Sequence, residues 1–178
     1  FDEVVGLILR EIEGVRNELV VDWRAENLEE KSGRITRGAA LALKSRVLLY
    51  AASPQFNPSG EKSKWAAAAA AAFEVINMGI YSLHPDYGGL FVAETSTTSP
   101  ETIWAVRMGA TNEFERKNYP IGTQGGGTGI CPSQNLVEAY ESTGEDTGDA
   151  YAGLDPRFYA TVLRNGAVSY THLTLPTN

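Results

Sequence analysis

Residues 2–20 carry hydrophobic side chains at the spacing of one face of an α-helix, with charged residues such as Arg10 and Glu13 on the other side. This pattern predicts an amphipathic helix over Asp2–Val20 whose apolar stripe packs against the core. The stripe consists of residues three or four positions apart: Val4, Ile8, Ile12, Val15 and Leu19.

A second helix is predicted over Thr36–Ala52. Thr36 is of a residue type that caps helix N-termini, and Pro54 lies just past the end, where proline cannot continue the helical hydrogen bonding. The helix is apolar on nearly every side, so we expect it to lie between neighbouring elements. Its charged residues Lys44 and Arg46 are expected to lay their stems along apolar surface, with their charged ends solvated or paired.

A third helix is predicted over Ser63–Met78, with Ser63 as its N-cap and Gly79 at the C′ position. Its centre is the alanine run Ala66–Ala72. Alanine is the best helix former and has a small side chain, which lets a neighbouring helix approach closely. The second and third helices, joined by a short loop containing prolines, are therefore expected to form an antiparallel pair.

The second half of the chain has weaker patterns. Alternating residues over Thr102–Met108 predict a short strand with Trp104 in its core. A short helix is predicted at about Pro132–Tyr140, and Asp155 followed by Pro156 is typical of an N-cap and the first position of a helix. The predicted fold class is mainly α, with an irregular second half.

Several segments follow one another along the chain: Gly33–Pro54, Trp65–Ala72, Gly79–Leu83, Asp86–Tyr87, Glu101–Trp104, Cys131–Glu141 and Asp155–Leu163. In this order they resemble the SusD/RagB family of nutrient-uptake lipoproteins, and the resemblance covers about residues 1–167.

The resemblance implies a tetratricopeptide-like helical repeat scaffold with an irregular, loop-rich subdomain carrying short strands. Residues 1–100 would be the end of the N-terminal helical region, and residues 101–167 the start of the C-terminal region. Because Phe1 already lies inside a helical pattern and family members begin with a lipoprotein signal, we expect the chain to be an interior fragment. Residues 168–178 depart from the family pattern and read like translated sequencing adapter, so we expect a non-native tail.

The resemblance also implies a function. Family members bind glycans at the cell surface without catalysis and deliver them to a SusC-like TonB-dependent transporter, as part of polysaccharide utilization. The full-length protein would be lipid-anchored on the extracellular face of the outer membrane. No cofactor is implied.

Composition narrows the alternatives. The net charge of -7 argues against nucleic-acid binding, which needs clustered basic residues. Two histidines and one cysteine offer little for a metal site or a nucleophile. The carboxylates are numerous enough to hold a glycosidase pair, although solvated surface charge is the expected role of these acidic residues. They are Glu138, Glu141, Glu145, Asp146, Asp149 and Asp155.

Binding a sugar requires aromatic faces and amide or charged groups, presented by loops on a rigid scaffold. The candidate ligand-binding residues of this kind are Trp23, Phe114, Asn118, Tyr119 and Gln124. Glycans and peptides are both compatible with such groups. Two alternatives from other classes remain, a glycoside hydrolase and a tetratricopeptide-type protein–protein adaptor. The irregular stretch 81–129 argues against the adaptor.

Overall fold

The computed structural model of the chain describes residues 1–23, 33–92, 99–106, 111–122, 124–142, 144 and 148–164. The fold is mainly helical, as predicted, and the described residues contain only one β-pairing, an isolated antiparallel bridge between Ser142 and Leu154. The helices are α1 (Asp2–Val15), α2 (Arg37–Ala52), α3 (Lys62–Ile76), the 3-10 helix η2 (Gly89–Phe91), α5 (Glu113–Asn118), α6 (Gln134–Glu138) and α7 (Pro156–Thr161).

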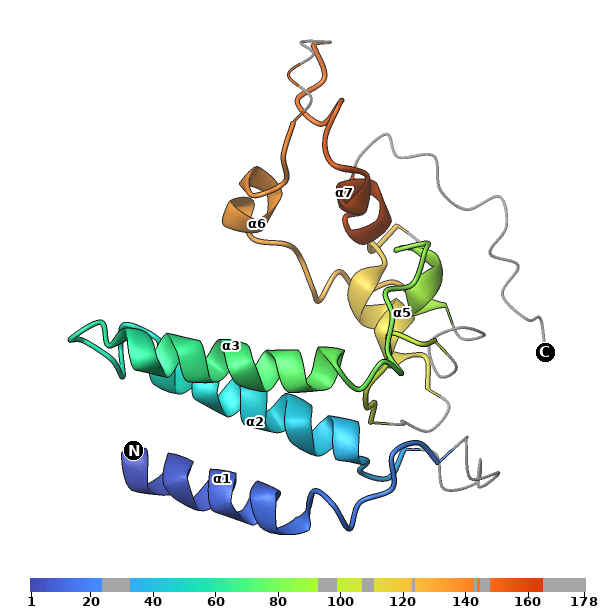
Figure 1. Cartoon of the computed structure of the whole chain (residues 1–178). Coiled ribbons are helices and arrows are strands. Elements are labelled where there is room, and N and C mark those ends of the chain that lie inside the picture. Colours follow the sequence, from blue (N-terminus) through green and yellow to red (C-terminus); the bar gives the residue numbers. More distant parts are fainter. Residues whose placement is uncertain are drawn as a thin grey trace. The chain divides into compact units, whose positions relative to one another are not determined.

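The chain forms two compact units. The first comprises the described residues of Phe1–Pro85 and Val92–Met108, and the second those of Asp86–Phe91 and Gly109–Asn178. In the first unit α1, α2 and α3 run in alternating directions, each antiparallel to the next, with α2 between the other two (Figure 1). None of the described helices is both long enough and apolar enough to span a membrane.

Helices α2 and α3 form the predicted antiparallel pair. Small side chains fill their interface: Ala68 and Ala71 of α3 are buried, as are Ala51 and Ala52 of α2. Because these side chains end at Cβ, the two backbones approach closely and the pair packs along its length.

The caps explain where the helices begin and end. The Thr36 hydroxyl accepts a hydrogen bond from the Ala39 amide at 3.2 Å, which confirms the predicted N-cap of α2. The predicted cap at Ser63 is wrong, because α3 begins at Lys62 with Glu61 at the N-cap position. Buried Asn57 causes this shift: its side chain accepts from the Glu61 amide at 2.9 Å and donates to the Glu61 carbonyl at 3.1 Å.

Helix α1 corrects both the predicted length and the predicted apolar face. It ends at Val15, and the chain then turns, with the Glu18 amide donating to the Val15 carbonyl at 2.9 Å. Of the predicted stripe only Ile12 is fully buried, whereas Val4 and Val15 are about half exposed, at 57% and 47%. The side of α1 that faces the neighbouring helices instead carries Val5, Leu9 and Ile12. Two adjacent stripes of this helix are apolar, and α2 packs on one of them.

The strand predicted over Thr102–Met108 is not formed in its described part, residues 102–106. The Thr102 amide bonds to the Ser99 carbonyl in a turn, and the Trp104 indole donates to the Gly33 carbonyl at 2.8 Å. The described residues form no β-ladder here, and a strand needs a ladder partner to satisfy its backbone. Arg107 and Met108 lie outside the described residues.

The second unit has a small aromatic core. Phe158 of α7 is completely buried and contacts the rings of Tyr140, Tyr151 and Tyr159. The predicted start of α7 is confirmed: Asp155 caps it by accepting from the Arg157 amide at 2.8 Å, with proline at the first position. The predicted helix over Pro132–Tyr140 is the shorter α6, capped by Ser133.

Candidate ligand-binding site

Most of the predicted binding residues lie on or beside α5 and the glycine-rich segment that follows it. The helix begins where the Thr111 hydroxyl accepts from the Glu113 amide at 3.2 Å, a local bond that starts a turn. Lys117 lies one turn after Glu113 and pairs with it at 3.2 Å. The basic residues Arg116 and Lys117 lie in the last turn, where positive charge complements the helix dipole.

After α5 the chain folds back on the helix end. The Lys117 carbonyl accepts from the amides of Gly129 at 2.8 Å and Ile130 at 2.9 Å, and the Tyr119 carbonyl accepts from the Thr128 amide at 2.9 Å. The Thr128 hydroxyl in turn accepts from the Ile121 amide at 2.9 Å. We call the described residues of 113–130 the α5–glycine loop. Its closure depends mainly on main-chain hydrogen bonds.

Two glycines make this closure possible. A Cβ on Gly126 would lie 2.2 Å from the Pro120 carbonyl oxygen, and one on Gly127 would lie 2.8 Å from the Arg116 carbonyl oxygen. Both neighbours are backbone atoms, which cannot rotate aside as a side chain can. The glycine cluster is therefore required where one part of the backbone crosses close to another.

The loop brings three of the predicted residues into one local structure. Asn118 is the last residue of α5, Tyr119 follows it directly, and both side chains are half-buried. Gln124 lies in the segment that folds back and is exposed. An aromatic ring and two amide side chains thus lie on a loop held at both ends. This combination can present a ring face and hydrogen-bonding groups to a ligand.

The other two predicted residues are placed differently. Phe114 belongs to α5, but its side chain lies outside the described part. Trp23 belongs to the first compact unit, where it is half-buried, and it is not part of the α5–glycine loop.

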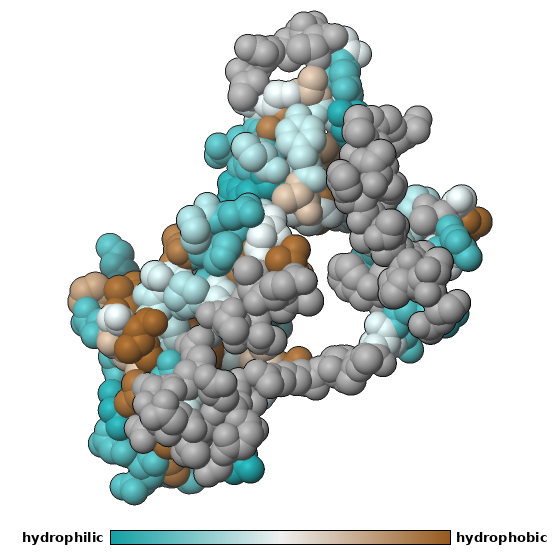
Figure 2. Space-filling view, turned by 90° about the vertical axis from the view of Figure 1, so that its right-hand side faces the viewer, coloured by the Kyte–Doolittle hydropathy of each residue, from teal (hydrophilic) through white to brown (hydrophobic). Residues whose placement is uncertain are grey.

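Two exposed tryptophans were missed by the sequence reasoning. Trp104 is 50% exposed, contrary to the expectation that it lies in a strand core, and Trp65 at the start of α3 is 45% exposed. Figure 2 shows that hydrophobic residues also lie at the surface among hydrophilic ones on the face it presents. The sequence signal for an exposed Trp104 was that no other segment with a strand pattern was available to pair with residues 102–108. For Trp65 the signal was the alanine run that follows it, because small alanine side chains form the helix interface without a bulky neighbour.

Comparison with known families decides the identity of this region. Residues 100–174 match the sequence model of the SusD family, so the matched stretch contains the whole α5–glycine loop. This region belongs to the SusD family. No curated protein and no solved structure matches the chain. The SusD match confirms the resemblance in the second half of the chain, and the mainly helical fold agrees with the SusD-like fold.

SusD proteins are in general non-catalytic, bind glycans during nutrient uptake and are associated with the outer membrane. Three of the acidic residues considered above for a glycosidase pair, Glu138, Asp149 and Asp155, have structural partners. Asp149 pairs with Arg164 at 3.4 Å, and Glu138 accepts from Gln134 at 3.1 Å. Asp155 caps α7, and the hydrogen bonds from Arg157 lower the pKa of its carboxyl to about 2.

Two acidic candidates for a glycosidase pair, Glu145 and Asp146, lie outside the described residues. Among the residues that the structure describes, no group of three or more histidine, cysteine or acidic side chains is arranged to hold a metal ion. The single cysteine, Cys131, is exposed. The α5–glycine loop is the candidate ligand-binding site of this region.

Proposed function

We propose that this chain is part of a cell-surface protein that captures oligosaccharides and delivers them to a SusC-like TonB-dependent transporter, without making or breaking a bond. The whole protein would be lipid-anchored on the extracellular face of the outer membrane. Residues 1–100 would form the end of its N-terminal helical region and residues 101–167 the start of its C-terminal region. Residues 168–178 would not be native sequence.

The observation that carries this proposal is the SusD match over residues 100–174 together with the local structure it contains. Within that stretch Asn118, Tyr119 and Gln124 belong to one loop that is closed by main-chain hydrogen bonds. A pyranose ring offers an apolar face for an aromatic side chain and hydroxyls for amide groups. The proposed ligand contacts are these three residues, with Phe114 and Trp23 as further candidates.

The closure of the loop also supports binding. A ligand that orders a flexible segment pays for the lost conformational freedom, which weakens the net affinity. Here the Lys117 and Tyr119 carbonyls already hold the returning backbone at 2.8 to 2.9 Å. Little further ordering would be needed, so more of the contact energy would appear as affinity.

Isothermal titration of the full-length protein against a panel of oligosaccharides tests the proposal. For a glycan that binds, we expect Tyr119→Ala to raise Kd roughly tenfold, because it removes the aromatic face, and Gln124→Ala to raise it by less. Tyr50→Ala is a matched control, since Tyr50 is an exposed tyrosine of α2 outside the loop. Absence of binding to every glycan, or equal effects of the two tyrosine variants, would contradict the proposal.

Delivery to a transporter is tested separately. The full-length protein and the SusC-like transporter encoded beside it should co-purify from solubilised outer membranes. Tyr119→Ala should leave this association intact, because the variant alters ligand contact alone. Failure to co-purify would contradict the handover step while leaving glycan capture standing.

A further inference from the structure

Four charged side chains from three helices meet in the first unit. The Lys44 ammonium of α2 lies 2.6 Å from a carboxylate oxygen of Glu13 on α1 and 2.6 Å from one of Glu74 on α3. The Arg16 guanidinium, at the end of α1, lies 3.0 Å from Glu13 and 2.8 Å from Glu74. Each cation thus bridges both carboxylates. We call this group the charge cluster.

The charge cluster is partly shielded from water. The side chains of Lys44 and Arg16 are 16% and 25% exposed, whereas those of Glu74 and Glu13 are 32% and 47% exposed. Ion pairs at such sites are screened less than pairs on the open surface, and losing one partner leaves the opposite charge poorly compensated. The cluster therefore contributes more to helix docking than four isolated surface charges would.

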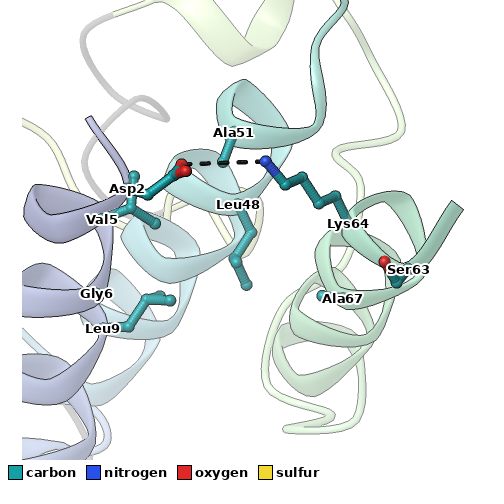
Figure 3. Close-up of a pocket in the computed structure, with 9 residues that line it drawn as sticks. All are labelled: Asp2, Val5, Gly6, Leu9, Leu48, Ala51, Ser63, Lys64 and Ala67. Carbon is teal, nitrogen blue, oxygen red and sulfur yellow. Dashed lines mark ion pairs between the residues drawn. The ribbon is translucent and has the colours of Figure 1, made fainter. Parts of the chain in front are cut away.

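Apolar contact between α1 and its neighbours is thin. Ile12 is the one buried residue of α1, and an apolar groove of about 310 Å³ lies between α1 and the α2–α3 pair. Figure 3 shows Val5 and Leu9 on one side of this groove and Leu48 on the other. At Gly6 and Gly14 an added Cβ would meet no other atom within 4 Å. Tight interdigitation is what gives core packing its strength, and α1 has little of it.

The remaining attachments lie at the two ends of α1. At its C-terminal end, the Arg37 side chain donates to the Arg16 carbonyl at 3.0 Å, and the Arg37 amide donates to the Val20 carbonyl at 2.9 Å. At the other end, the ring of Phe1 stacks on that of Phe56 at 3.8 Å between centroids. Asp2 and Lys64 approach to 4.0 Å across the mouth of the groove, but Asp2 is largely exposed.

We propose that α1 is a releasable helix, held on the α2–α3 pair chiefly by the charge cluster of Glu13, Arg16, Lys44 and Glu74. When the cluster is neutralised, α1 leaves while the alanine-rich pair stays folded. Release would uncover the apolar groove lined by Leu48, Ala51 and Ala67. An isolated helix of this length is marginal in water, so the released segment would also lose helical hydrogen bonds.

Acid is one way to neutralise the cluster. Hydrogen bonds from Lys44 lower the pKa of Glu13 and of Glu74, and Arg16 acts in the same direction on both. These two cations are the charged groups that face the carboxylates from α1 and α2. The stabilisation is present above the ordinary glutamate pKa and is lost as the pH falls through the lowered values. Protonation would then leave Lys44 and Arg16 as neighbouring, uncompensated positive charges.

Hydrogen–deuterium exchange of the full chain at neutral pH tests the proposal. Glu13→Gln and Glu74→Gln mimic the protonated carboxyls at nearly constant shape, and Glu11→Gln is the control on an exposed carboxylate of the same helix. We expect both cluster variants to lower the protection of α1 amides roughly two- to fivefold, with α2 and α3 unchanged. The effect of Glu74→Gln is the more telling, because the substitution is on α3 and the response is expected on α1.

A second measurement uses the unaltered protein. Protection factors, corrected for the intrinsic pH dependence of exchange, should fall in α1 before they fall in α2 and α3 as the pH is lowered. Unchanged α1 protection in both cluster variants would overturn the proposal. So would an equal loss of protection across all three helices, because it would show that α1 unfolds only with the whole unit.

Discussion

Gly126 is the position where the closure of the α5–glycine loop can be tested most directly. Replacing it with alanine adds a single methyl group 2.2 Å from the Pro120 carbonyl oxygen and 2.9 Å from that of Tyr119. The first distance is on the order of 1 Å shorter than an ordinary contact. Since both neighbours belong to the backbone, the loop must move away from the end of α5 to admit the methyl group.

The cost of forcing extra volume into a close contact is about 1–3 kcal/mol. That energy is comparable to the few hydrogen bonds that close the loop, among them the bond from the Thr128 amide to the Tyr119 carbonyl at 2.9 Å. We therefore expect Gly126→Ala to open the loop rather than to be absorbed. The equilibrium between closed and open loop should shift by roughly five- to 150-fold.

The assay is hydrogen–deuterium exchange over residues 116–130 of the full chain, with Gly122→Ala as the matched control, because a Cβ at Gly122 meets no atom within 4 Å. Gly126→Ala should expose the amides of Thr128, Gly129 and Ile130 and leave those of α2 and α3 unchanged. It should also weaken glycan binding in the full-length protein. Equal protection of the three amides in both variants would refute the close approach on which the loop depends.

Three further predictions concern the scaffold. Thr36→Ala should lower the free energy of unfolding by about 1 kcal/mol through loss of the α2 cap, whereas Ser63→Ala should have little effect; equal values in chemical denaturation would contradict the caps described above. Ala71→Leu should destabilise the α2–α3 pair by about 1–3 kcal/mol, because Ala71 is buried where the helices touch, and an unchanged melting temperature would refute this. By NMR titration the Asp155 carboxyl should remain charged as the pH falls below 3.8 and protonate only near its pKa of about 2; Arg157→Ala should raise that pKa part of the way back, since the backbone amide at 157 still donates.

The helices of this protein were predictable where capping and propensity agree. Thr36 accepts from the amide of Ala39 at the start of α2, and Asp155, followed by proline, accepts from the amide of Arg157 at the start of α7. The start of α3 was not predictable from Ser63, because Asn57 satisfies the groups at Glu61 and sets the helix start two residues earlier than the serine would. The side chain of Asn57 comes from the preceding loop, so the sequence at the start of α3 carries no pattern that shows its effect.

The predicted packing face of α1 and the predicted strand over Thr102–Met108 were wrong for a related reason. Periodicity shows that a segment is amphipathic, but α1 has two adjacent apolar stripes, and only its neighbours decide that Ile12 is buried while Val4 is exposed. Alternation likewise indicates a strand only where a partner exists. Here Trp104 bonds to the Gly33 carbonyl in place of a ladder.

The candidate site was predictable in its parts but not in its assembly. Aromatic and amide residues in loops pointed to Asn118, Tyr119 and Gln124 individually. What joins them is the return of the glycine segment to the Lys117 carbonyl, and a run of glycines does not reveal which backbone it will approach. The close contacts at Gly126 and Gly127 are visible only in three dimensions.

The hydrogen bonds that close the α5–glycine loop determine which of its residues can be substituted without loss of the loop structure. The loop is closed mainly by hydrogen bonds between peptide groups, and every residue except proline can supply both of these groups. The exposed side chain of Gln124 can therefore be replaced without breaking these bonds. A lineage, or a designed library, could vary that position and its exposed neighbours while the frame beneath stays constant. New preferences for cargo could then arise by small steps, each leaving a folded protein.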